Sequence, residues 1–116
     1  MNRKIAMFAF NGDPMCFIHV LLNTLDMDEK GFDVALVIEG SATKLVPEIS
    51  RDGHPLNKLY MKVEEAGLIN CVCRACANKM EVLERVENEK LPVCGPMSGH
   101  PSMADYINEG YDVISF

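Results

Sequence analysis

The sequence lacks tryptophan and is poor in aromatic residues, which make up 7% of the chain. It also lacks a basic cluster, because its 11 lysines and arginines are scattered singly among 17 acidic residues, for a net charge of -6. A nucleic-acid surface needs clustered basic residues to attract phosphates, often with aromatic rings that stack on bases. The composition therefore predicts no nucleic-acid partner.

Long hydrophobic runs are absent as well. The apolar run Ile5–Phe10 follows a basic start, Met1–Lys4. It is too short for a signal peptide, and no stretch approaches the roughly 20 apolar residues of a membrane-spanning helix. We therefore expect a cytoplasmic protein that has no membrane partner and keeps its thiols reduced.

Phosphate-binding motifs are missing. The chain contains neither G-x-G-x-x-G nor G-x-x-x-x-G-K-[ST]. The first loop, Asn11–Pro14, instead places the carboxylate of Asp13 where a nucleotide or flavin phosphate would sit. We expect no nucleotide or flavin cofactor.

Cysteine is present five times, an odd number at uneven spacing. That pattern favours free, reactive or metal-binding thiols over a disulfide framework. Three of the five cysteines fall within Cys71–Cys76. We expect the chemistry of the chain to reside there.

The pattern of apolar residues predicts one α/β domain over residues 1–116, with a mostly parallel sheet and helices on both faces. Asp13 is expected to cap a helix that begins at Pro14 and stops at Gly31. Pro47 should limit a short helical piece that begins near Ser41. The expected strands are 5–10, 33–39, 67–73, 91–94 and 111–116. Pro92 should place the strand 91–94 at an edge of the sheet. Further helices are expected over 55–66, from 74, over 81–90 and over 102–109.

Ligand sites in such sheets lie outside the carboxyl ends of the strands. This rule brings four separate segments into one neighbourhood: 11–16, 39–41, 73–76 and 94–100. Within them the rim candidates are Asn11, Cys16, Glu39 and His100. Of these, Glu39 could act as a general base, and Cys16 is also compatible with simple packing among apolar neighbours.

The cysteine corner lies where the third strand should give way to a helix near Arg74. The unpaired N-H groups of a helix start, together with the positive charge of Arg74, would lower the pKa of the Cys73 thiol and make it nucleophilic. Cys73 and Cys76 form a C-x-x-C pair whose sulfurs should be neighbours. Cys71 should lie deeper on the same strand face, as a packed residue, while Cys94 could be a resolving thiol, a ligand or the end of an edge strand.

On these residues the chain resembles the DsrE/DsrF-like family, small proteins with a flavodoxin-like sheet that include sulfur-relay subunits. The resemblance covers nearly the full length and rests on 5–16, 37–40, the strand ending in Cys73, and 110–114. It implies that Cys73 carries sulfur as a persulfide, that a sulfur donor or acceptor protein is the partner, and that the chain forms a homo-oligomer, a trimer or hexamer. The chain departs from relay subunits in having Cys71 and Cys76 beside Cys73 and in its loop 94–100.

We therefore expect a small cytoplasmic protein that handles sulfane sulfur or thiols, a sulfur carrier or sulfurtransferase with Cys73, Cys76 and Arg74 at its centre. Two alternatives stay open. One is thioredoxin-like dithiol redox chemistry at Cys73 and Cys76, although only 40 residues follow Cys76. The other is a non-enzymatic metal-binding or oligomeric interaction protein, with Cys73, Cys76, Cys94 and His100 as zinc ligands.

Overall fold

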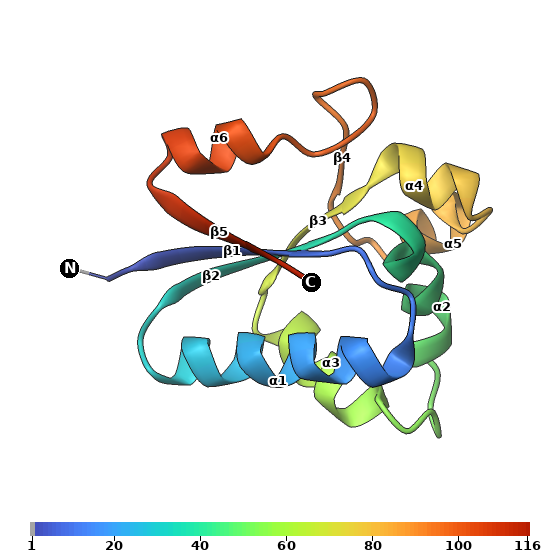
Figure 1. Cartoon of the computed structure of the whole chain (residues 1–116). Helices are drawn as coiled ribbons and strands as arrows, with labels where there is room; N and C mark the ends of the chain where they lie inside the picture. Colours follow the sequence, from blue (N-terminus) through green and yellow to red (C-terminus); the bar gives the residue numbers. More distant parts are fainter. Residues whose placement is uncertain (1) are drawn as a thin grey trace.

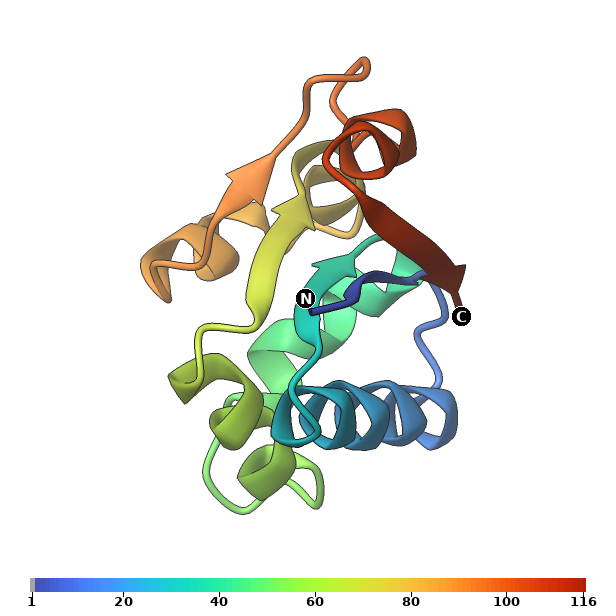
Figure 2. The same cartoon turned by 90° about the vertical axis from the view of Figure 1, so that its left-hand side faces the viewer.

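A computed structural model describes residues 2–116; Met1, part of the basic start, lies outside the described residues. Five parallel strands form one sheet in the order β4-β3-β2-β1-β5 (Figures 1 and 2). The strands are β1 (Lys4–Ala9), β2 (Asp33–Ile38), β3 (Ile69–Cys73), β4 (Val93–Cys94) and β5 (Tyr111–Ser115). The predicted α/β class and parallel sheet are confirmed.

The first helix begins as the sequence predicts. α1 (Pro14–Glu29) has Asp13 as its cap, and the Asp13 carboxylate accepts the N-H of Met15 at 2.8 Å. Proline is tolerated at the first helical position because that residue needs no intrahelical N-H bond. The loop that follows β1 therefore ends at Asp13, where α1 begins.

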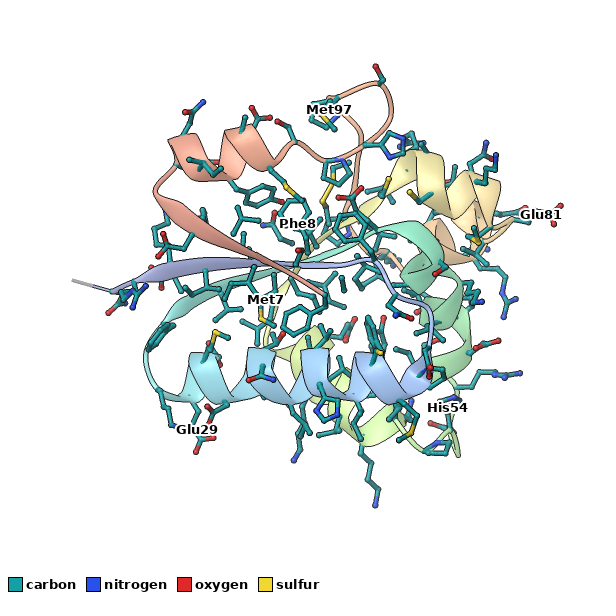
Figure 3. All side chains as sticks on the ribbon, viewed as in Figure 1. Met7, Phe8, Glu29, His54, Glu81 and Met97 are labelled. Carbon is teal, nitrogen blue, oxygen red and sulfur yellow. A yellow bond between two sulfur atoms is a disulfide. The ribbon has the colours of Figure 1, made fainter. Side chains whose placement is uncertain are left out.

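The helices cover the two faces of the sheet unequally. α1, α3 (Asn57–Glu65) and α5 (Leu83–Asn88) contribute to the larger core with Met7, while α6 (Met103–Asn108) covers the other face over Phe8. Figure 3 shows Met7 and Phe8 on opposite sides of β1. Alternation along a strand explains this, because successive side chains point to opposite faces.

One predicted boundary is wrong. Pro47 was expected to limit the helical piece after β2, but a 3-10 helix, η1 (Gly40–Leu45), continues directly through it into α2 (Val46–Ile49). Pro47 lies in the first turn of α2, where a missing N-H breaks no hydrogen bond.

The edge strand β4 is two residues long and pairs with β3, with Val72 beside Val93 and Cys73 beside Cys94. Because the strands are parallel, the carboxyl ends of β1, β2, β3 and β4 meet at one edge. The loops that follow β2, β3 and β4 therefore surround one region, with α4 (Arg74–Lys79) beginning directly after β3 (Figure 1). Within residues 2–116, no helix has both the length and the apolar character to cross a membrane.

Candidate functional site

The loop after β4 is a tight turn that presents His100. The backbones of Met97 and His100 exchange two hydrogen bonds of 2.9 Å, and the N-H of Gly99 donates to the Gly95 carbonyl at 3.1 Å. Gly99 has φ +94°, a conformation that glycine adopts without steric cost. The turn thus gives His100 a defined position.

The same turn is attached to the start of α4. The carbonyl of Gly99 accepts the N-H of Ala75 at 2.9 Å, and the Cys73 thiol can donate to it at 3.6 Å. A Cβ atom on Gly99 would lie 3.0 Å from the Cβ of Ala75. A side chain at this position would therefore require the turn or the helix to shift by a few tenths of an ångström.

Four side chains from different segments meet at this edge of the sheet. Glu39 follows β2, Cys73 ends β3, Cys76 lies in α4 and His100 lies in the turn, and their ligand atoms all fall within 4.8 Å of one another. The Nδ1 atom of His100 lies 3.1 Å from the Cys73 sulfur and 3.6 Å from the Cys76 sulfur. The closest carboxylate oxygen of Glu39 is 3.8 Å from the same Nδ1 atom.

Glu39 and Cys73 are buried, whereas Cys76 and His100 are partly exposed. Burial raises the pKa of the Glu39 carboxyl, and the nearby His100 acts in the opposite direction. A cleft of about 370 Å³ adjoins Glu39 and His100; its other lining residues are Phe10, Met97, Pro101, Ser102, Met103 and Ala104. The cleft thus reaches Glu39 and His100, whereas Cys73 and Cys76 are not among its lining residues.

The pKa of Cys73 differs from the sequence prediction. Burial raises the pKa of this thiol to about 12. The N-H of Cys76, which approaches the Cys73 sulfur at 3.4 Å, opposes the rise, as expected for the start of a helix. Desolvation is the larger effect, so the expected lowering of this pKa is wrong.

Arg74 lies in the first turn of α4, where its guanidinium is 3.8 Å from the carboxylate of Glu87. Both side chains are about half exposed. The guanidinium of Arg74 therefore lies toward α5, and the shortest hydrogen-bond contact of the Cys73 sulfur is with the imidazole of His100.

Cys71 and Cys94 form a disulfide across β3 and β4, with 5.8 Å between their Cα atoms. The expectation that all five cysteines are thiols is therefore wrong for this pair. Cys94 is therefore not a free thiol that could resolve a disulfide or bind a metal. Glu39 takes the position that the sequence prediction gave to Cys94, beside Cys73, Cys76 and His100. The register places Cys94 beside Cys73, and Cys71, two residues earlier on the same face of β3, is also within disulfide distance of Cys94.

The other two rim candidates lie outside this four-residue group. The side-chain oxygen of Asn11 accepts the N-H of Asp13 at 2.8 Å, and Cys16 is a free, partly exposed thiol in α1. The sequence rule for strand ends thus placed Glu39 and His100 in the neighbourhood where the structure brings them together with Cys73 and Cys76. It did not reveal that Glu39, rather than Cys94, completes the group.

A comparison with protein families decides the affiliation. The model of the DsrE/DsrF-like family matches residues 4–116, almost the whole chain. The chain belongs to the DsrE/DsrF-like family. This confirms the family that the sequence resembled, and it supports a sulfur-relay type of role at the level of the family.

Two proteins similar to this chain are both named as uncharacterized. An uncharacterized protein of Methanocaldococcus jannaschii is 32% identical over 97 residues, which span 84% of this chain and 77% of that protein. An uncharacterized protein of Archaeoglobus fulgidus is 38% identical over 60 residues, 52% of this chain and 97% of its own length.

The DsrE-like fold also matches a solved structure. A conserved protein of unknown function from Bacteroides thetaiotaomicron superimposes with a TM-score of 0.73, covering 97% of this chain and 94% of the other. Sequence identity is 14%, so the likeness extends to the fold alone.

Proposed function

We propose that this protein carries sulfane sulfur as a persulfide on Cys73, as a sulfur carrier or sulfurtransferase. The observation that carries the proposal is the 3.1 Å contact between the Cys73 sulfur and Nδ1 of His100. Membership of a family with sulfur-relay members supports it. A thiol paired with an imidazole is a common arrangement for an activated nucleophile.

The activation step follows from the burial of Cys73. A thiol with a pKa of about 12 is protonated near neutral pH, so a base must take its proton as the sulfur reacts. Neutral His100 accepts that proton at Nδ1, and the carboxylate of Glu39, 3.8 Å away, stabilises the imidazolium that forms. In this mechanism His100, rather than Arg74, activates Cys73.

The transfer step balances without an external oxidant. The Cys73 sulfur attacks the outer sulfur of a donor persulfide, forming the new S-S bond as the S-S bond of the donor breaks. The electron pair of that bond leaves with the donor thiolate, which takes up the proton from His100. An acceptor thiolate then removes the outer sulfur and leaves Cys73 as a thiolate.

The persulfide of Cys73 can also react with Cys76, as a second route. Its thiolate can attack the inner sulfur on Cys73, which forms a Cys73–Cys76 disulfide and releases hydrosulfide. The two sulfurs lie within 4.8 Å of each other, so the required approach is short. Cys76 is partly exposed while Cys73 is buried, so Cys76 is the thiol of the pair that solvent reaches more easily.

The direct test is intact-protein mass spectrometry after incubation with a persulfide donor, with peptide mapping of the added sulfur. We expect one sulfur atom on Cys73 in the unmodified chain and none in Cys73→Ser. Sulfur mapped equally to Cys16 and Cys76 in the unmodified chain, or none on Cys73 in Cys76→Ser, which cannot form the Cys73–Cys76 disulfide, would reject the proposal. Cys16→Ser serves as the matched control because Cys16 lies outside the group.

Dithiol redox chemistry is the second candidate, favoured by the proximity of Cys73 and Cys76. Its product is a Cys73–Cys76 disulfide without added sulfur, which the second route from the persulfide also yields. The two candidates are therefore separated in Cys76→Ser, where only persulfide chemistry leaves an added sulfur on Cys73. A loss of two hydrogens after treatment with a disulfide donor, with no persulfide from a persulfide donor, would favour this function.

We also propose that the chain forms a homo-oligomer, in keeping with its family resemblance. The outer edge of β5 ends the sheet, and nearby apolar side chains are exposed: Ile107 is 59%, Ile114 39% and Phe116 38% accessible. An open strand edge with apolar neighbours is typical of a pairing surface. Light scattering should give a trimer or hexamer, and a monomer at all concentrations would reject this part.

A further inference from the structure

The four-residue group of Glu39, Cys73, Cys76 and His100 has a donor set that suits a metal ion. It offers two sulfurs, one imidazole nitrogen and one carboxylate oxygen. Cys73 and Cys76 come from one local C-x-x-C pair at the junction of β3 and α4, and the fold adds Glu39, which follows β2, and His100 from the turn after β4. Such convergence is what a metal site requires.

The spacing of the donors matches a tetrahedral ion. Metal bonds of about 2.0 to 2.3 Å in a tetrahedron place neighbouring donors about 3.3 to 3.8 Å apart. The distances from Nδ1 of His100 are 3.1 Å to Cys73, 3.6 Å to Cys76 and 3.8 Å to Glu39. Small rotations of side chains would therefore place all four donors around one centre.

The buried carboxylate of Glu39 is a second observation that points to a cation. Its side chain is 8% exposed, and a buried carboxylate is costly unless a positive charge faces it. Among residues 2–116, His100 is the one basic group within 4.0 Å of its oxygens, and this imidazole is neutral unless protonated. A divalent cation at the centre would neutralise Glu39 and both thiolates together.

We propose that these four side chains form a Zn²⁺ site in the chain when Cys73 and Cys76 are reduced. Thiolates favour Zn²⁺ or Cu⁺, and the added imidazole and carboxylate in a tetrahedral arrangement favour Zn²⁺. Binding releases the protons of both thiols, because the thiolate is the ligand form. Half-exposed His100 and the adjoining cleft provide a path of entry.

The site has a consequence for reactivity. Four protein ligands complete the coordination of Zn²⁺ and leave no open position, so the ion would cover the Cys73 sulfur instead of activating a substrate. Zinc and a persulfide on Cys73 therefore exclude each other. Zinc binding does not depend on sulfur transfer, so measurements of metal binding alone test this proposal.

The experiment titrates the reduced full chain with Zn²⁺ in competition with a chromophoric chelator, and in parallel with Co²⁺ as a spectroscopic probe. We expect one ion per chain and a thiolate-to-cobalt charge-transfer band in the near ultraviolet. Cys73→Ser and Cys76→Ser should each weaken this band. Glu39→Gln, which keeps the shape of the side chain, should lower zinc affinity about tenfold or more.

Two control variants distinguish this site from other cysteine sites. Cys16→Ser and the double variant Cys71→Ser/Cys94→Ser should bind Zn²⁺ as the unmodified chain does, with circular dichroism to confirm folding. Loss of binding in the double variant would assign the metal to Cys94 and overturn the proposal. So would the absence of stoichiometric binding, or unchanged affinity in folded Glu39→Gln.

Discussion

The Nδ1 atom of His100 lies 3.1 Å from the sulfur of Cys73, although 27 positions separate the two residues in the sequence. The tight turn after β4 and its attachment to α4 through Gly99 produce this contact. Both the proposed sulfur chemistry and the proposed zinc site depend on it.

Replacement of His100 by alanine should slow persulfide formation on Cys73 by about 100-fold or more, because the buried thiol then loses the imidazole 3.1 Å from its sulfur and keeps only the Glu39 carboxylate of the group as a base. The measurement is the rate of sulfur loading by mass spectrometry with zinc removed. His19→Ala is the matched control, since His19 is an exposed histidine of α1 outside the group. Equal rates in the two variants would exclude His100 as the base.

The alkylation rate of Cys73 should keep rising with pH beyond about 8.5, where an ordinary thiol is half ionised. The reason is that burial raises its pKa to about 12, so the reactive thiolate is scarce at neutral pH. Iodoacetamide labelling of metal-free protein, resolved by peptide mass spectrometry, measures this. A plateau below pH 8.5 would instead indicate a thiolate stabilised by the start of α4.

Replacement of Gly99 by alanine should destabilise the chain by about 1 kcal/mol or more, because an alanine would have to adopt the left-handed backbone conformation of Gly99. Its Cβ would also meet Ala75 at 3.0 Å. Thermal unfolding measures the cost. Gly53→Ala is an informative control, because Gly53 also has positive φ but no atom within 4 Å of the added Cβ. A Gly99 variant no less stable than the Gly53 variant would argue against the close packing of turn and helix.

Removal of the Cys71–Cys94 disulfide should lower the free energy of unfolding by about 3 kcal/mol, because the link closes a loop of 23 residues in the unfolded chain. The comparison is denaturant unfolding of the unmodified chain and of Cys71→Ser/Cys94→Ser, both without reductant. Adding reductant to the unmodified chain should remove most of the difference. If reductant leaves the difference intact, lost packing rather than the bond is responsible.

Replacement of Glu89 by glutamine should stabilise the chain at neutral pH and have little effect in acid. Burial raises the pKa of Glu89, although the hydroxyl of Ser50, which donates to it at 3.0 Å, opposes the rise. A carboxyl whose pKa is higher in the folded state favours folding when protonated, and that contribution is lost as pH rises from about 4 through the folded pKa. Thermal unfolding between pH 4 and 8 tests the sign. A variant less stable than the unmodified chain at pH 7 would contradict it.

Local sequence patterns were sufficient for most of the secondary structure. Asp13 and Pro14 define the start of α1, and the apolar run before Cys73 together with Arg74 defines the junction of β3 and α4. Pro47 misled the prediction because a proline ends a helix in its interior but not in its first turn. The rule that ligands lie at strand ends also identified the neighbourhood of Glu39, Cys73 and His100.

By itself, the sequence determined the α/β class, the order of strands and helices and the position of the C-x-x-C pair, because these depend on caps, apolar periodicity and glycine and proline within a few residues. Only the tertiary structure decided that Cys94 pairs with Cys71 and that Glu39 joins Cys73, Cys76 and His100. It also decided that Cys73 is buried, so that its pKa rises instead of falling. Those outcomes depend on the register of an edge strand and the seating of one turn on α4, which are contacts between segments far apart in the chain.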